Sequence, residues 1–181
     1  MLKPLQYLNK KSTITGPTVW LTGVIHGDEP GGEVVINKLF AELEKVELLK
    51  GSLHAFPVIN KSGLVKKVRH LPETGEDLNR LFPGRLGGTI GEAIASDVWQ
   101  QIIKTKPDLV LDLHNDWLNS ISYTLIDDRE NMSPDFHARL GQIALVAGLV
   151  TVQENVKTFG QTLSGSLTKK SVPALTLELG G

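Results

Sequence analysis

The 181-residue sequence contains no cysteine. This absence excludes disulfide bonds, a thiolate nucleophile and thiolate metal ligands, so a bound metal would need His, Asp and Glu as its ligands. The sequence also has no excess of either charge, because 19 Lys and Arg offset 20 Asp and Glu for a formal net charge of −1. Such a balance gives no general affinity for nucleic acid or anionic membranes, and we expect neither as a partner.

Two kinds of apolar segment are also missing from the chain. No run of apolar residues is long enough to span a bilayer. The first residues lack the basic and then apolar pattern of a secretory signal peptide. We therefore expect a cytoplasmic protein that does not cross a membrane.

The composition is that of a globular protein, with 40% hydrophobic and 22% charged residues. We expect residues 1–181 to form a single domain with a substantial core. Apolar strands alternate with segments of helical periodicity, which predicts an α/β fold with a mixed, largely parallel central sheet flanked by helices. The predicted strands cover residues 18–25, 52–59, 108–114, 121–126, 149–152 and 171–179, residues 1–17 could add an edge strand, and the predicted helices cover residues 30–45, 89–104, 134–146 and 160–170.

The first predicted strand leads directly into His26-Gly27-Asp28-Glu29, and a helix follows at Pro30. Gly27 lets the backbone turn without a side-chain penalty, so that the imidazole and the carboxylate can converge. His nitrogen and Glu oxygen are ligands that Zn²⁺ accepts at about 2.0–2.2 Å. The alternative interpretation is a strand–turn–helix connection whose polar residues only cap the helix.

Three apolar strands are followed or ended by an ionisable residue, namely His26, His114 and Glu178. In open α/β sheets, ligands bind beyond the carboxyl ends of the strands. Together with Glu29, these residues supply two imidazoles and one carboxylate for a catalytic zinc site, and a second carboxylate for proton transfer. Asp112 lies on the same face of its strand as His114, and could orient that ligand or serve a structural role.

The segment 60–88 has no clean periodicity and is rich in Gly, Pro and charge, which is typical of a functional loop. Arg69 and Arg80 lie in it. One of them could stabilise an oxyanion and the other could hold a substrate carboxylate, although each alone could be a surface residue or an ion-pair partner. The glycines of residues 87–91 do not form a phosphate loop, because no Gly-Lys-Ser/Thr ending follows.

Four motifs of the chain resemble those of the succinylglutamate desuccinylase/aspartoacylase family, which belongs to the zinc carboxypeptidase-like superfamily. The resemblance covers the chain from about Thr18 onwards, and the motifs occur in the family's order. They are His26-Gly27-Asp28-Glu29, Asp77-Leu78-Asn79-Arg80, Asp112-Leu113-His114 and Leu177-Glu178-Leu179-Gly180.

The resemblance implies a zinc carboxypeptidase-like fold and one Zn²⁺ per chain. It implies His26, Glu29 and His114 as the zinc ligands and Glu178 as the general base. The family usually continues past this glutamate into a β-rich C-terminal region. Since the present chain ends three residues after Glu178, we expect the catalytic domain without that region.

The resemblance also implies how the substrate is held. Arg69 is expected to polarise the substrate carbonyl, with Arg85 as an alternative in the same loop. Asn79 and Arg80 are expected to hold a substrate carboxylate. The implied function is a zinc-dependent deacylase that releases an acyl group from an N-acylated amino acid or a similar small carboxylate.

Other functions compete with the deacylase. A zinc carboxypeptidase would use the same zinc and arginines, and differs in whether the free carboxylate lies on the acyl or the amine side. A non-catalytic zinc-binding domain of the same fold would need neither Glu178 nor Arg80. A metal-free binder of sugars or nucleotides ranks last, because no phosphate loop is present.

Overall fold

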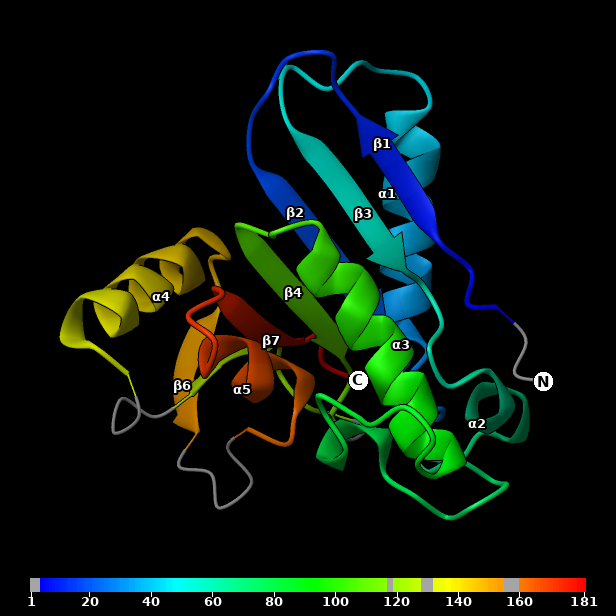
Figure 1. The fold of residues 1–181 in the computed structure, drawn as a ribbon. Coiled ribbons are helices and arrows are strands. Elements are labelled where there is room, and N and C mark those ends of the chain that lie inside the picture. The colour runs from blue at the N-terminus through cyan, green and yellow to red at the C-terminus, as the bar shows by residue number, and fades with distance from the viewer. Residues whose placement is uncertain (1–3, 117–118, 128–131, 155–159) are drawn as a thin grey trace.

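A computed structural model of the chain describes residues 4–116, 119–127, 132–154 and 160–181. Strands and helices alternate along it as predicted (Figure 1). The strands are β1 (Leu8–Lys11), β2 (Thr18–Gly23), β3 (Ser52–Phe56), β4 (Leu109–His114), β5 (Tyr123–Asp127), β6 (Val150–Glu154) and β7 (Ala174–Glu178). The helices are α1 (Gly31–Leu43), α2 (Lys61–Lys66), α3 (Ile90–Lys104), α4 (Pro134–Val146) and α5 (Leu163–Thr168), with a 3-10 turn η1 (Leu78–Arg80).

The seven described strands form one sheet in the order β1-β3-β2-β4-β7-β5-β6. Only two pairs are antiparallel, β1 with β3 and β5 with β7. The pairs β2–β3, β2–β4, β4–β7 and β5–β6 are parallel. The predicted mixed, largely parallel sheet is therefore confirmed, and the edge strand expected within residues 1–17 is β1.

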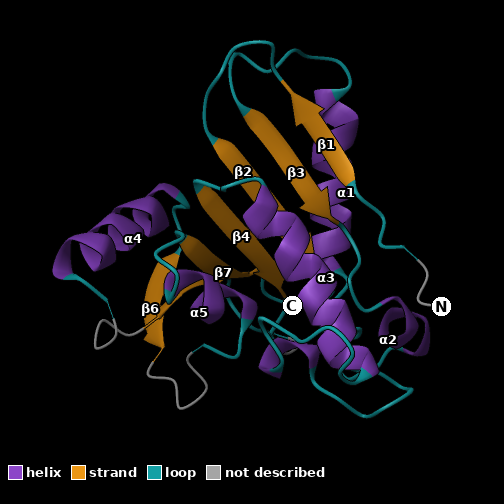
Figure 2. Cartoon of the chain, in the orientation of Figure 1, coloured by secondary structure: helices purple, strands orange, loops and turns teal. Residues whose placement is uncertain are grey.

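Helices cover both faces of this sheet (Figure 2). Trp20 and Leu21 are neighbours on β2 and point to opposite faces, as the alternation of a strand requires. Trp20 belongs to the buried cluster made with α3 and α5, and Leu21 to the cluster made with Ile36 of α1. Leu111 of β4 packs against both this second cluster and the cluster around Leu140 of α4. One layer is thus α1 with α4, and the other is α3 with α5.

Capping side chains fix several helix ends. The Thr89 hydroxyl and the Glu92 carboxylate form a capping box at the start of α3, which agrees with the helix predicted over residues 89–104. Ser133 caps α4, whose bounds agree with the predicted 134–146. The predicted helix 160–170 was too long at both ends. At its start, Gly160 has a φ of +81° and Thr162 provides the actual cap of α5, which ends at Thr168.

Two further expectations were wrong in detail. The first predicted strand was expected to reach residue 25, but β2 ends at Gly23 because Val24 adopts a φ of +50°, outside the extended region. The segment 60–88 was expected to be irregular, but it contains α2 and η1. Within the described residues, no helix is long and apolar enough to cross a membrane.

The register of the sheet brings the polar strand ends together. His114 of β4 lies directly opposite Glu178 of the parallel strand β7. On the other side of β7, Glu178 lies directly opposite Tyr123 of the antiparallel strand β5. Residues that lie opposite one another project from the same face, so these three side chains form a row across the sheet.

Candidate metal centre and active site

The turn after β2 is fixed by tight backbone packing. Val24 is fully buried, and its carbonyl accepts the N–H of Asn60 over 2.8 Å. A β-branched residue with positive φ is a rare conformation, which costs about 1–3 kcal/mol and is retained where the surroundings enforce it. Gly27 packs so closely on α2 that a Cβ there would lie 2.1 Å from the backbone carbon of Gly63. The backbone beside His26 is thus held against α2.

The three predicted metal ligands lie together. Nδ1 of His26 lies 2.7 Å from Oε1 of Glu29, and Nδ1 of His114 lies 2.7 Å from Oε2 of the same carboxylate. One ligand atom from each of the three residues lies within 4.8 Å of the other two. His26 and His114 are nearly fully buried, and Glu29 is 9% exposed. Two imidazoles and one carboxylate that converge in a buried position could hold a metal ion, and zinc accepts this donor set.

Each histidine has a second carboxylate at its other ring nitrogen. Nε2 of His114 lies 2.9 Å from Oδ2 of Asp112, whose other oxygen accepts the Thr22 hydroxyl. Nε2 of His26 lies 3.2 Å from Oδ1 of Asp77. Carboxylates in this position fix the tautomer and orientation of ligating histidines and raise their basicity. This geometry fits the orienting role considered for Asp112, and Asp77 makes the corresponding contact with His26.

The carboxylates around the two imidazoles favour a positive charge within the cluster. Burial opposes ionisation of Glu29, but hydrogen bonds with His114 and His26 outweigh it and lower the pKa of Glu29 to about 2. Burial also opposes protonation of His114, yet Asp112 and Glu29 raise its pKa well above the usual range. Asp77 has a pKa well below its usual range, because contact with His26 and Arg69 outweighs its burial. Carboxylates arranged around two imidazoles fit a divalent cation bound between them.

Glu178 lies beside this cluster, at the end of β7. Its Oε2 is buried and has no hydrogen-bond partner among the residues that the structure describes. Burial raises the pKa of Glu178 to about 7, with Glu29 adding to the rise and His114 opposing it. Across the strand pair, the Tyr123 hydroxyl donates to Asp116 over 2.8 Å. A buried carboxylate with a raised pKa beside a candidate metal site is a candidate general base.

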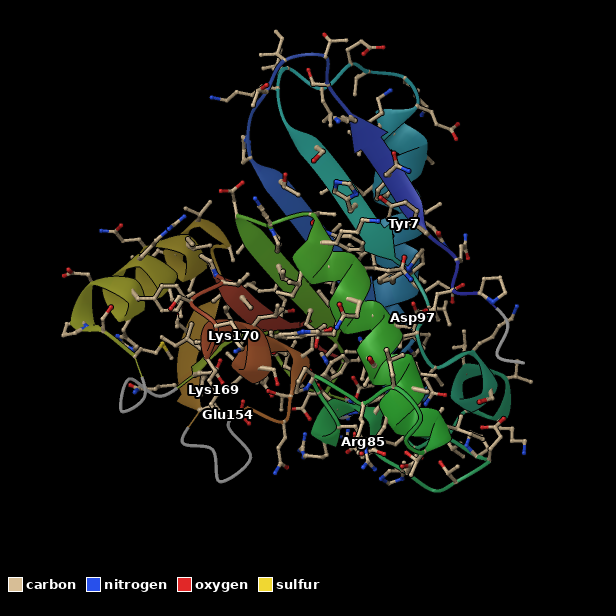
Figure 3. All side chains as sticks on the ribbon, in the orientation of Figure 1. Tyr7, Arg85, Asp97, Glu154, Lys169 and Lys170 are labelled. Carbon is tan, nitrogen blue, oxygen red and sulfur yellow. The ribbon has the colours of Figure 1, made fainter. Side chains whose placement is uncertain are left out.

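Arg69 is the arginine that reaches the cluster. It donates from one terminal nitrogen to Glu29 Oε1 and from Nε to Asp77 Oδ2, each over 3.2 Å. Its side chain is 37% exposed, so it faces the open side of the cluster. Arg85, the alternative from the same loop, instead lies near the start of α3 and pairs with Glu92 over 3.0 Å (Figure 3).

Asn79 and Arg80 lie in η1, directly after Asp77. Asn79 is buried and its side-chain oxygen accepts the N–H of Leu163 over 2.9 Å, which connects η1 to the start of α5. Arg80 is exposed and donates to the Asn79 carbonyl over 2.8 Å. Asp77 accepts the Asn79 N–H as the cap of η1, so that the contact to His26 and the placement of Asn79 depend on one carboxylate.

Three residues near the cluster had no role in the sequence analysis. Asp77 begins the motif Asp77-Leu78-Asn79-Arg80. Asp is a common N-cap residue, and this signal could have predicted a structural role for Asp77. Asn115 donates its backbone N–H to Glu29 Oε2 over 3.2 Å. Tyr123 reaches the site only through strand pairing, and no sequence pattern indicated that.

The sequence profile of the succinylglutamate desuccinylase/aspartoacylase catalytic domain matches residues 15–181. A curated relative is the N-alpha-acetyl-L-2,4-diaminobutyric acid deacetylase of Halomonas elongata, 38% identical over 100 residues. That alignment covers 55% of this chain and 29% of the relative.

Solved structures agree with this match. A succinylglutamate desuccinylase/aspartoacylase from Rhodobacter sphaeroides superposes with a TM-score of 0.83 at 28% identity, over 97% of this chain and 52% of that protein. A metallo-carboxypeptidase from Burkholderia cenocepacia superposes with a TM-score of 0.78 at 18% identity, over 98% of this chain and 52% of that protein. The second likeness concerns the fold alone. The chain spans about half the length of these solved relatives.

Proposed function

The chain belongs to the succinylglutamate desuccinylase/aspartoacylase family, and on this premise we propose that it is a zinc-dependent amide hydrolase. Its substrate would be an N-acylated amino acid or a similar small carboxylate. The observation that carries the proposal is the convergence of His26, Glu29 and His114 beside Glu178, whose Oε2 has no hydrogen-bond partner within the described part of the chain. A purely structural metal site would need no such carboxylate.

In this proposal His26, Glu29 and His114 hold the metal, with Asp77 and Asp112 orienting the two imidazoles. Bound zinc supplies a Lewis acid that polarises the acyl carbonyl and lowers the pKa of a water molecule to about 7. The buried Asp112, at 1% exposure, keeps the His114 ring from rotating. The protein thus fixes the donor atoms before the metal binds, which limits the reorganisation that binding requires.

Glu178 moves the proton. It accepts a proton from the attacking water as the C–O bond forms at the acyl carbon. It then delivers that proton to the nitrogen as the C–N bond breaks, so that an amine and a carboxylic acid leave. A positioned carboxylate in this role contributes about 10²–10⁴-fold to the rate.

Arginine and asparagine side chains orient the substrate. Arg69 faces the open side of the cluster and donates to the oxygen on which negative charge develops, as an oxyanion-stabilising group. Exposed Arg80 offers the planar fork that binds a carboxylate through two hydrogen bonds. Asn79 Oδ1 is already occupied by the Leu163 N–H. The amide nitrogen of Asn79 is therefore the donor assigned to the substrate.

The relative from Halomonas elongata is named as a deacetylase of an N-acetylated amino acid. It supports an N-acetyl amino acid as the first substrate to try for this chain. The proposal is tested by metal analysis of the purified protein and by hydrolysis of N-acetyl, N-succinyl and N-formyl amino acids, with a C-terminal peptide substrate in the same panel. About one zinc per chain and hydrolysis that chelation abolishes are expected.

The His26→Ala and His114→Ala variants serve as the matched pair for the ligand set. Each should lose tight zinc binding, because two ligands rarely hold zinc where three are needed. An unchanged metal content in both variants would refute the ligand assignment. Hydrolysis confined to the peptide substrate would replace the deacylase with a carboxypeptidase.

A further inference from the structure

Asn115 directly follows His114 and makes three hydrogen bonds, two to the segment 29–31 and one to the segment after β7. Its backbone N–H donates to Glu29 Oε2 over 3.2 Å. Its side-chain oxygen accepts the N–H of Gly31, the first residue of α1, over 2.7 Å. Its side-chain nitrogen donates to the carbonyl of Gly180, beyond the end of β7, over 2.8 Å.

The contact with α1 replaces a cap that the helix itself lacks. Pro30 occupies the N-cap position and makes no side-chain capping hydrogen bond. The first orphan N–H of α1 is instead satisfied by Asn115, from 84 residues further along the chain. A Cβ at Gly31 would lie 2.3 Å from the Asn115 side-chain oxygen, so this contact requires glycine.

The contact with Gly180 connects Asn115 to the proposed general base, Glu178. Gly180 lies two residues after Glu178, and the intervening Leu179 donates its N–H to the His114 carbonyl over 2.8 Å. The segment after β7 is therefore held at both His114 and Asn115. A shift of this segment would move Glu178 relative to the ligand cluster.

We infer that Asn115 is a positioning residue that sets the distance between the proposed metal ligands and the proposed general base. Through Gly31 it fixes the start of α1, two residues after Glu29, and through Gly180 it fixes the segment that follows Glu178. The inference rests on the proposed function, because it concerns the spacing of those groups. It predicts that the two side-chain contacts of Asn115 have separable consequences.

The first test compares Asn115→Ala with Ser133→Ala by zinc affinity and thermal unfolding. Ser133 caps the remote helix α4 through the Phe136 N–H, so both variants remove the acceptor of a first-turn N–H. Ser133→Ala should lower Tm by about 2–4 °C and leave zinc affinity unchanged. Asn115→Ala should also weaken zinc binding by about 10–100-fold, as loss of a group that orients metal ligands does. Equal zinc affinity in the two variants would reduce Asn115 to an ordinary helix cap and overturn the inference.

The second test uses Asn115→Asp, which keeps an acceptor for the Gly31 N–H but cannot donate to the Gly180 carbonyl. Zinc affinity should be retained, whereas kcat should fall by about tenfold or more with little change in KM. A kcat equal to that of the wild type would refute the connection to Glu178.

A double-mutant cycle tests the contact itself. Gly31→Ala should weaken zinc binding in the wild type, because its Cβ would displace the Asn115 side chain. In the Asn115→Ala background, the Cβ of Gly31→Ala no longer meets Oδ1 or Nδ2 of residue 115. The loss of zinc affinity caused by Gly31→Ala should therefore largely disappear in that background, as expected for two coupled residues. Additive effects would contradict the inference.

The wild type separates failure of this inference from failure of the proposed function. A wild type that binds zinc and hydrolyses the substrate, beside variants that behave like Ser133→Ala, overturns only the role of Asn115. A wild type that binds no zinc overturns the proposed function and the inference together.

Discussion

The close approach of Gly27 to α2 allows a prediction of what a single methyl group would do to the site. In Gly27→Ala the new Cβ would lie 2.1 Å from the backbone carbon of Gly63 and 2.4 Å from the Leu64 nitrogen, whereas ordinary contacts begin near 3.4 Å. The opposing atoms are backbone, so no side chain can rotate away, and the two segments must separate by about 1 Å. Overpacking of this kind costs about 1–3 kcal/mol, and two immobile backbones favour the upper end.

The displacement should also reach the site. Gly27 donates its N–H to the Arg69 carbonyl over 3.3 Å, and Asn60, the cap of α2, donates to the same carbonyl over 3.1 Å. Pushing α2 away from Gly27 therefore moves the arginine as well as His26. Gly27→Ala should lose about 3 kcal/mol of unfolding free energy and bind zinc more weakly than the wild type.

Gly141→Ala is the matched control, because a Cβ at Gly141 in α4 would meet nothing within 4 Å. The unfolding free energy of this variant should exceed that of the wild type by about 0.5–1 kcal/mol, the usual benefit of Ala over Gly inside a helix. Urea unfolding and a competitive zinc titration on the three proteins provide both readouts. Wild-type stability and zinc affinity in Gly27→Ala would refute the packing argument.

Three further predictions follow from single side chains. Arg80→Lys should lower kcat/KM for carboxylate substrates by at least about tenfold and leave Tm unchanged, because lysine lacks the planar fork of the guanidinium. If Arg80 only formed a surface ion pair, the kinetics would be unchanged. Asp112→Asn should weaken zinc binding by about 10–100-fold in equilibrium dialysis, since His114 loses the carboxylate at its Nε2; wild-type affinity would contradict this role. Burial raises the pKa of Asp127 to about 6, so the folded state holds this proton more tightly than the unfolded chain. The unfolding free energy should therefore fall by about 2 kcal/mol as the pH rises from about 4 to about 7. Asp127→Asn should remove that decline, being more stable than the wild type at pH 7.5 but not at pH 4, and parallel pH profiles of the two proteins would refute the assignment.

Much of the fold could be predicted because local signals agreed with it. The capping-box spacing of Thr89 and Glu92 marked the start of α3, and the helical spacing of Phe136, Leu140 and Ile143 indicated α4. Failures occurred where packing overrides local preference. Val24 is β-branched and predicts a strand, but burial in the turn holds it at a positive φ. Helix α2 has only six residues, too few for a periodic pattern to be recognised.

The candidate site divides in the same way. The juxtaposition of these side chains could be predicted because His26 and Glu29 share one turn, and because His114 and Glu178 end neighbouring strands. The partners of these residues could not, since they depend on contacts between distant segments. Asp77 reaches His26 across 51 residues, and Asn115 reaches Gly31 across 84.

The most direct test of the mechanism is one preparation of Glu178→Gln measured for zinc content, Tm and turnover. The amide is nearly isosteric with the carboxylate and cannot accept the proton of the attacking water. If Glu178 is the general base, zinc content and Tm should match the wild type while hydrolysis falls by about 10²–10⁴-fold. A variant that is folded, loaded with zinc and fully active would contradict the mechanism, and one that loses zinc or stability first would make Glu178 a structural carboxylate.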